Sequence, residues 1–522
     1  MSLSRRGFLA GLLATAACSR GGDDAPTAEA PTTSARPPVV PAVGAAGNPF
    51  TLGVASGDPR PNRVVLWTRL APFPLEGGGM PDAPVEVAWD VATDDRFRDV
   101  VRKGVATARP SAAHSLHVDV RGLEPASDYF YRFRLGDDIS PVGRTRTLPR
   151  RDASPERLRL ALASCQDYGT GYYTSYRDLA DRDVDVVLFL GDYIYEHPIF
   201  AFDGRANPTT EAVTLDDYRA RYALYHTDPD LQAAHHAVPW VATWDDHEVS
   251  NNYAGDTSET GASPDQFRAR RAAAYRAWYE HVPVRLAPPR GSDVRLYREF
   301  AFGDLARFFV LDVRQHAAEP PCRDVSEPLT DQGPTCPERE DPGRSILGRE
   351  QQRWLLDALG RADERWSVLA QQVMMAGLNV NPADGPPEYY LDSWDGYPAS
   401  RRRVLDGLGE ADVADPIVLT GDYHASFVAD LRRDPFDTDG RVVATEFVGP
   451  AISSIPFATD FREQNPHVRY FEPRNGYATC TVERDQWTTE FRYVTDVRDP
   501  QAAVEPGAAF VVERGRPEAT PA

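Results

Sequence analysis

Residues that can bind metal ions or transfer protons follow several short apolar runs of this 522-residue sequence. The segments concerned are 164–166 (SCQ), 191–196 (GDYIYE), 245–252 (DDHEVSNN), 312–314 (DVR), 371–372 (QQ) and 421–424 (GDYH). They combine one thiol and imidazoles with several hard oxygen donors, whereas a structural zinc site prefers four cysteine and histidine ligands at short spacing. Such a mixed set favours a multinuclear centre. Closely spaced cations can stabilise both the attacking and the leaving oxygen of a phosphoryl transfer.

The apolar runs predict the scaffold that positions these segments. They are 160–163, 184–190, 238–242, 308–311, 368–370 and 417–419. Each run is continuous enough to be a strand buried on both faces, and helical stretches alternate with the runs. A long helix is predicted to begin after Ser263, with Pro264 in its first turn, and a second one covers 348–362. Because ligands bind beyond the carboxyl ends of strands in open α/β sheets, we expect the polar segments to meet at one active-site edge.

Residues 47–150 predict a separate all-β domain. Short, partly alternating apolar runs are divided there by glycine, proline and aspartate. The segment 122–125 resembles the turn before a late strand of fibronectin type III modules. We therefore expect a small β-sandwich over 47–150, a boundary near 147–151 and a larger domain over 155–522 that carries the candidate site.

The first 46 residues predict an export signal and a tether. The pair Arg5-Arg6 forms a twin-arginine motif, and the apolar stretch up to Ala17 is about half of the ~20 residues that span a bilayer. Cys18 could be lipidated after cleavage, although Thr15 is atypical for that signal. Residues 19–46 have the composition of a disordered tether. We expect export by the twin-arginine machinery to the periplasm or the medium, or lipid anchoring to the cell envelope.

Charge and cysteine content narrow the function classes further. The sequence has 57 basic and 78 acidic residues, a net charge of −21. An acidic surface argues against a nucleic-acid-binding groove and suits multivalent cations. Cys322 and Cys336 bracket a loop rich in proline and acidic residues, which fits a disulfide formed in an oxidising compartment.

The order of the motifs SCQ, GDYIYE, WDDHEVSNN and GDYH resembles that of the PhoD-type alkaline phosphatases, a branch of the metallophosphoesterases. The likeness covers nearly the whole chain beyond the leader. It implies an α/β (α+β) metallophosphoesterase β-sandwich layered with helices, preceded by the small fibronectin III-like sandwich. It also implies hydrolysis of phosphate monoesters, and often of diesters, outside the cytoplasm by a metal-activated hydroxide. The implied cofactors are ferric iron (Fe3+) and calcium (Ca2+), and the implied substrates are small phosphate esters.

The resemblance carries metal-binding roles to single residues. The implied iron ligands are Cys165, Asp192, Tyr195 and His424, with Asp192 and Asp422 shared towards calcium. Asp246 and Asn252 are implied calcium ligands, and Asn251 stays an alternative to Asn252. Gln371 or Gln372 stands where relatives have a histidine ligand, and the sequence does not choose between the two.

Two residues are expected to act on the substrate. His247 occupies the position of the family's motif histidine, which suits protonation of the leaving alkoxide or stabilisation of the transition state. Arg314 lies just beyond a predicted strand end, where its guanidinium could bind two phosphate oxygens.

Two other interpretations stay open. The same metal core would serve a phosphodiesterase or a phospholipase D-like enzyme acting on lipid headgroups, and lipidation at Cys18 would place it beside such substrates. A non-catalytic cell-surface binding protein is the third hypothesis. A decayed site should have lost carboxylates, yet Asp192, Asp246 and Asp422 are all present. A phosphohydrolase is therefore the leading hypothesis.

Overall fold

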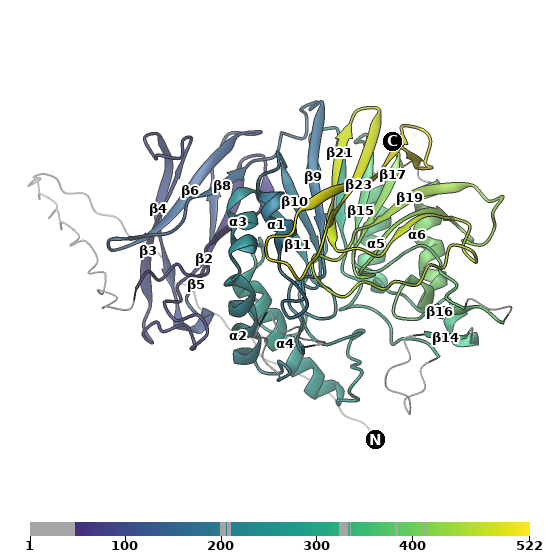
Figure 1. Cartoon of the computed structure of the whole chain (residues 1–522), viewed down its shortest axis with the longest axis horizontal. Coiled ribbons are helices and arrows are strands. Elements are labelled where there is room, and N and C mark those ends of the chain that lie inside the picture. The colour runs from purple at the N-terminus through teal and green to yellow at the C-terminus, as the bar shows by residue number, and fades with distance from the viewer. Residues whose placement is uncertain are drawn as a thin grey trace, which may run out of the picture. The chain divides into compact units, whose positions relative to one another are not determined.

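The computed structural model describes residues 47–198, 205, 210–322, 332–334, 336–381, 385–410 and 413–522 (Figure 1). The twin-arginine motif, Cys18 and the tether up to residue 46 lie outside the described residues. Among the described residues, every helix is too short or too polar to traverse a lipid bilayer.

The N-terminal part is the antiparallel β-sandwich that the sequence predicts. Its strands are β1 (Val54–Arg60), β2 (Arg63–Arg69), β3 (Val85–Ala92), β4 (Val100–Ala108), β5 (Ser115–Arg121), β6 (Asp128–Leu135), β7 (Asp138–Ile139) and β8 (Gly143–Arg146). A short 3-10 helix, η1, covers Pro110–Ala112. Alternate residues of β6, such as Tyr131 and Phe133, are buried and pack against Val64 and Leu66 of β2. The alternating pattern therefore buries one face of each sheet in a shared core.

The N-terminal sandwich and the larger part share one ten-stranded sheet, and their backbones approach closely where they join. The ten-stranded sheet contains, in order, β24 (Thr520–Pro521), β23 (Val504–Glu513), β22 (Gln486–Val494), β21 (Gly476–Glu483), β9 (Arg157–Ala163), β10 (Val186–Leu190), β11 (Trp240–Thr243), β1, β2 and β5. Gly57 of β1 pairs with Trp240 of β11. A Cβ atom at Gly57 would lie 2.0 Å from the carbonyl oxygen of Pro283, so only glycine allows this approach. The domain limits at 150 and 155 stay predictions, since hydrogen bonding is continuous between the two parts.

The larger part is built from two sheets that pack face to face. The first contains β9 (Arg157–Ala163), β10 (Val186–Leu190), β11 (Trp240–Thr243), β21 (Gly476–Glu483), β22 (Gln486–Val494), β23 (Val504–Glu513) and β24 (Thr520–Pro521). The second has the order β12-β13-β15-β17-β19-β18-β20. Its strands are β12 (Arg298–Phe302), β13 (Ala306–Val310), β15 (Trp366–Ala370), β17 (Pro416–Thr420), β18 (Ser426–Arg432), β19 (Val442–Val448) and β20 (Val468–Glu472). A continuous apolar core, which includes the fully buried Leu188 and Leu419, lies between them.

Helices cover the outer face of each sheet (Figure 1). Those packed on the first sheet are α1 (Thr174–Ala180), α2 (Leu215–His226), α3 (Pro229–Ala237) and α4 (Pro264–His281). Those on the second are α5 (Gly348–Leu359) and α6 (Pro398–Glu410). The helix predicted after Ser263 is present, and the Ser263 side chain forms a capping box with Gln266. The predicted α/β sandwich layered with helices is confirmed.

Smaller elements occur in the connections between strands of the second sheet. They are the antiparallel pair β14 (Gln332–Pro334) and β16 (Glu388–Tyr390) and the 3-10 helices η2 (Pro337–Glu340) and η3 (Trp394–Gly396). The cysteines expected to pair, Cys322 and Cys336, are joined by a disulfide.

Buried histidines under the first sheet make the stability of the fold sensitive to acid. Tyr193 places its hydroxyl 3.2 Å from His226 Nε2 and 2.7 Å from His235 Nε2, and both imidazoles are buried. Burial lowers the pKa of His226 to about 3. Because an unfolded histidine titrates near 6.5, the unfolded chain binds more protons than the folded one below that pH, so stability falls as the solution is acidified.

We expect His226→Gln to flatten this pH dependence by about 1.4 kcal/mol per pH unit between about pH 6 and pH 4. The measurement is urea unfolding of the wild type and the variant with a chelator present, so that metal release does not contribute. Equal slopes for the two proteins would show that His226 is not a neutral buried imidazole.

Candidate metal centre

Parallel strands bring the polar segments to one edge of the molecule. β9, β10 and β11 pair in parallel in the first sheet, as β13, β15, β17 and β19 do in the second. Cys165, Asp192 and Asp245 follow the strands of the first sheet, and Asp422 and His424 follow β17 of the second. The edge therefore joins residues separated by more than two hundred positions in the sequence.

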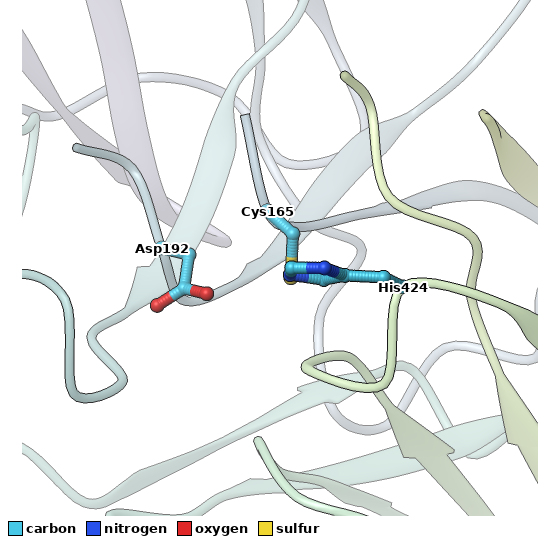
Figure 2. Close-up of side chains that lie close together, drawn as sticks. All are labelled: Cys165, Asp192 and His424. Carbon is cyan, nitrogen blue, oxygen red and sulfur yellow. The ribbon is translucent and has the colours of Figure 1, made fainter. Parts of the chain in front are cut away.

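Cys165, Asp192 and His424 form the first group of donors (Figure 2). One ligand atom from each lies within 4.8 Å of the others. The Tyr195 hydroxyl donates to Asp192 Oδ2 at 2.9 Å and lies 3.0 Å from His424 Nε2, so it belongs to the same group. The Nδ1 atom of His424 lies 3.0 Å from the carbonyl oxygen of Ile455, which holds the ring and leaves Nε2 directed at the group.

A second group of carboxylates adjoins the first through Asp192. Asp192, Asp246 and His247 place one ligand atom each within 4.8 Å of one another, and Asp245, Asp246 and Asp422 do the same. The backbone N–H of Asn252 donates to Asp246 Oδ2 at 2.7 Å. Asp192 thus belongs to both groups, and Asp246 links the two triads of the second group. Shared ligands of this kind suit neighbouring cations.

The backbone is strained at these residues. Cys165, Asp192, Asn252, Asp422 and His424 have φ angles of 58°, 59°, 49°, 61° and 55°. This left-handed region costs free energy for residues other than glycine, and such strain gathers at functional sites. The surrounding structure therefore holds the candidate ligands in conformations that they would not adopt freely.

The carboxylates have polar atoms that protein groups do not satisfy. Asp192 Oδ1 and Asp245 Oδ2 are buried and have no hydrogen-bond partner among the described residues. Burial and then nearby carboxylates raise the pKa of Asp192 well above its ordinary value, and burial does the same for the pKa of Asp245. Buried carboxylates are normally paired or coordinate metals. The donor set therefore fits bound cations.

Glu248 fixes the two loops that carry these aspartates. Its carboxylate accepts hydrogen bonds from the backbone N–H groups of Asp192, Tyr193 and Asp245 at 3.1, 2.7 and 2.8 Å. The loops also approach closely, because a Cβ atom at Gly191 would lie 2.4 Å from the Cβ atom of Asp245. One buried carboxylate therefore sets the spacing between two candidate ligands.

His247 is held by Glu196. Its Nδ1 atom lies 2.7 Å from Glu196 Oε2, and its ring lies 4.1 Å from the Tyr195 ring, centroid to centroid. Burial opposes a charge on the ring, but the carboxylates of Glu196, Asp246 and Asp192 raise the pKa of His247 well above its ordinary value. Nδ1 therefore donates to Glu196, which leaves Nε2 for another partner.

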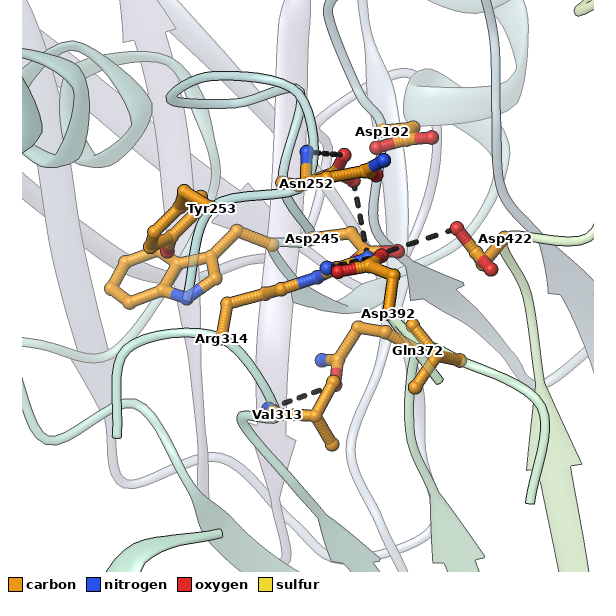
Figure 3. A network of polar contacts seen from close by, with 12 residues as sticks. Asp192, Asp245, Asn252, Tyr253, Val313, Arg314, Gln372, Asp392 and Asp422 are labelled. Atoms are coloured by element: carbon orange, nitrogen blue, oxygen red, sulfur yellow. Dashed lines mark hydrogen bonds and ion pairs between the residues drawn. The ribbon is translucent and has the colours of Figure 1, made fainter. Parts of the chain in front are cut away.

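Arg314 is placed differently from the expectation. Its guanidinium forms ion pairs with Asp245, with Asp392 at 2.6 Å, with Asp246 at 3.4 Å and with Asp422 at 3.8 Å (Figure 3). The side chain is only 2% exposed. These contacts direct the guanidinium at the carboxylates of the centre, and the expected contact with phosphate stays a prediction.

The two glutamines are also engaged away from the donors. Gln371 accepts from Trp394 Nε1 at 3.0 Å and donates to Thr420 Oγ1 at 2.7 Å. Gln372 accepts from the backbone N–H of Val313 at 3.2 Å. Neither lines the pocket described below, so the structure brings Gln371 and Gln372 close to the edge without adding their side chains to the donor groups.

A pocket opens over the two donor groups. Its lining residues are Asp192, Asp246, His247, Asn251, Asn252, Met374, Ala376, Leu378, Tyr390, Asp392, Ser393, Asp395, Asp422, Tyr423, His424 and Phe457. Asn251 and Asn252 both reach it, and Asn251 donates its side-chain amide to Glu259 at 2.8 Å. The Asn251 amide is therefore already engaged by another side chain, which favours Asn252 as the ligand.

Several residues of the site escaped the sequence analysis. Glu196, Asp245 and Glu248 lie inside the motifs already singled out, so the signal for them was adjacency to candidate ligands. Asp392 and Phe457 follow no apolar strand run and reach the pocket from loops, so no comparable pattern pointed to them.

Comparison with known proteins agrees with this geometry. A family model described as PhoD-like phosphatase matches residues 160–491, and one described as PhoD-like phosphatase, N-terminal domain, matches residues 35–149. The chain belongs to the PhoD-like phosphatase family. The resemblance found from the motifs is confirmed, and membership identifies the chain as a phosphoric ester hydrolase.

Two members of the PhoD-like family are similar over most of their length. Alkaline phosphatase D of Bacillus subtilis (strain 168) is 46% identical over 479 residues, covering 89% of this chain and 81% of the relative. The solved structure of PhoD is 45% identical and superimposes with a TM-score of 0.87, covering 91% of this chain and 92% of that one. The sandwich and the layered sheets are thus the family's architecture.

Proposed function

We propose that the protein is an exported alkaline phosphatase that hydrolyses phosphate monoesters and diesters with ferric iron and calcium as cofactors. The observation that carries the proposal is the pair of donor groups joined through Asp192 beneath an open pocket. The thiol of Cys165, the phenol of Tyr195 and the imidazole of His424 would hold the iron. The oxygens of Asp246, Asn252 and Asp422 suit calcium, which takes hard oxygen ligands.

The groups in and around the pocket have distinct roles in this proposal. Bound cations would supply polarisation of the phosphoryl oxygens and a lowered pKa for a water molecule, and the donor groups described above would hold them. His247, which lines the pocket and is held by Glu196 at 2.7 Å, would donate a proton from its other ring nitrogen to the leaving oxygen. Arg314 and Glu248 would keep the aspartates of the centre in position through their ion pairs and hydrogen bonds.

Export is part of the proposal. The disulfide between Cys322 and Cys336 supports it, because disulfides persist in oxidising compartments outside the cytoplasm. The twin-arginine motif and Cys18 suggest the route and a lipid anchor. Trapping of the precursor in cells that lack the twin-arginine translocase, followed by mass analysis of the mature N-terminus, would test both.

The experiment for the activity is hydrolysis of a chromogenic phosphate monoester and of its matched diester at alkaline pH with calcium present. Preference for the monoester supports an alkaline phosphatase. Preference for the diester favours the phosphodiesterase alternative, with lipid headgroups as the next substrates. No hydrolysis of either by an iron-loaded sample would contradict the proposal.

A spectroscopic prediction tests the iron ligands. We expect the purified protein to show a visible charge-transfer band from tyrosinate to ferric iron, and Tyr195→Phe to abolish it, because the Tyr195 hydroxyl lies within 3.0 Å of both Asp192 Oδ2 and His424 Nε2. Tyr225→Phe is the control, since the Tyr225 hydroxyl contacts the backbone N–H of Tyr195 instead. A band that persists in Tyr195→Phe would exclude Tyr195 as the ligand.

A further inference from the structure

The pocket has an apolar wall beside the donor groups. Met374, Ala376 and Leu378 line it from the segment after β15, and Tyr390, Tyr423 and Phe457 line it from three other segments. The apolar residues thus converge on the pocket from several parts of the chain. A site that bound only inorganic phosphate and small polar alcohols would have no use for such a wall, since it gains nothing from apolar contact.

Phe457, Tyr423 and Tyr390 form an aromatic corner. Phe457 stacks on the His424 ring with centroids 5.2 Å apart and planes at 7°. Tyr423 meets Phe457 edge to face at 5.9 Å and Tyr390 at 5.6 Å. Tyr423 is buried, whereas Phe457 is 50% exposed, so its ring lies against the site and still has a free surface.

The loop that carries Phe457 is tied to the donor groups. The carbonyl oxygen of Ile455, two residues earlier, lies 3.0 Å from His424 Nδ1, and Ser454 Oγ donates to the Tyr195 hydroxyl at 2.8 Å. The Phe457 ring is therefore held at a fixed place beside the residues that would bind the phosphate.

The charged residues that line the pocket do not discriminate between phosphate esters, so the apolar wall determines which ester is preferred. None of the described lining residues is a lysine or an arginine, and Arg314 is already engaged by carboxylates. Aspartates dominate the polar lining. The described lining therefore offers no fixed guanidinium or ammonium group to distinguish one phosphate ester from another, and the organic group of the ester is what its side chains can recognise.

We propose that Phe457, with Tyr423 and Tyr390, selects phosphate esters that carry a flat, apolar group next to the phosphate over esters of small polyols. The proposal rests on the phosphohydrolase function proposed above and adds its substrate class. The ring of such a substrate stacks on Phe457 while its phosphate lies over Asp192 and Asp246. Aromatic stacking adds to the favourable free energy of the apolar area that binding buries.

The test compares benzyl phosphate with glycerol 1-phosphate, because both leaving groups are primary alcohols of similar acidity and intrinsic reactivity differs little. We expect the wild type to have the higher kcat/KM for benzyl phosphate. Phe457→Ala should lower that value about tenfold, chiefly through KM, and change the value for glycerol 1-phosphate less than about twofold. Phe457→Leu should have a kcat/KM for benzyl phosphate between those of the wild type and Phe457→Ala, because leucine keeps apolar area but lacks the flat ring.

Phe436→Ala is the matched control. Phe436 is 39% exposed and packs on Tyr389 and His467 rather than lining the pocket, so both substrates should be turned over as in the wild type. Equal losses for both substrates in Phe457→Ala would overturn the proposal and assign the ring to support of His424, which metal analysis of the variant would reveal. Turnover of neither substrate by the metal-loaded wild type would instead contradict the phosphohydrolase function itself.

Discussion

Asp192→Asn is expected to lower kcat at least about a thousandfold, the largest effect of any single substitution in the centre. Asp192 belongs to both donor groups, so its loss weakens two cation positions at once. Stabilisation of transition-state charge by bound metals amounts to several kcal/mol, and each ~1.36 kcal/mol is a factor of ten in rate. The measurements are kcat with the chromogenic esters and the metal content of the purified variant.

The same substitution should have opposite effects on stability with and without metal. In the metal-free protein, burial and neighbouring carboxylates raise the pKa of Asp192, which means that the charged form destabilises the fold at neutral pH. An asparagine at this position carries no charge, so the metal-free variant should melt above the metal-free wild type, and the order should reverse when metal is added. Asp95→Asn, on the exposed surface of the sandwich, is the control for loss of one negative charge. Full activity in Asp192→Asn would refute the assignment of the centre.

Arg314→Gln is expected to cost about 3–5 kcal/mol of unfolding free energy. The substitution leaves Asp245, Asp392 and Asp246 without the buried cation that they surround, and breaking a buried ion pair from one side costs that amount. Arg314→Lys should recover only part of it, because an ammonium group does not present the planar fork that contacts several carboxylates. Chemical denaturation of the three proteins measures the effect, with Arg349→Gln on the exposed face of α5 as the control.

This result separates two roles for the guanidinium. If Arg314 bound phosphate, as its place after a strand suggested, Arg314→Gln would raise KM and leave the unfolding free energy unchanged. The ion pairs in the structure predict the reverse, with loss of stability and of metal affinity before any change specific to the substrate.

The sequence predicted the parts of the site that follow strands. Cys165, Asp192, Asp246 and Asp422 each come shortly after an apolar run, and parallel strands place their carboxyl ends together whatever the connections are. For these residues, the local sequence pattern was sufficient to predict where they lie in the fold. Likewise, the capping box at Ser263 and the alternation in β6 depend only on nearby residues.

Roles that depend on side-chain direction could not be predicted in this way. Arg314 and Gln371 also follow strands, yet contacts with Asp392, in the loop after β16, and with Trp394, the first residue of η3, determine where their polar atoms lie. Glu248 acts through backbone N–H groups, whose directions no residue pattern reveals. Phe457 reaches the pocket from a loop whose path is set by contacts distant in sequence.

The hydrogen-bonded passage from β1 to β11 also determines how the molecule can move. Apart from the pairing of Gly57 with Trp240, Asp58 forms an ion pair with Arg298 at 2.8 Å, and Trp67 donates to the carbonyl oxygen of Glu280 at 2.9 Å. A hinge between two modules needs a linker that few contacts cross. Here rotation of the N-terminal sandwich against the larger part would break a sheet that both share. Entry of the substrate therefore depends on the loops around the pocket, and the sandwich is a rigid support for the catalytic part.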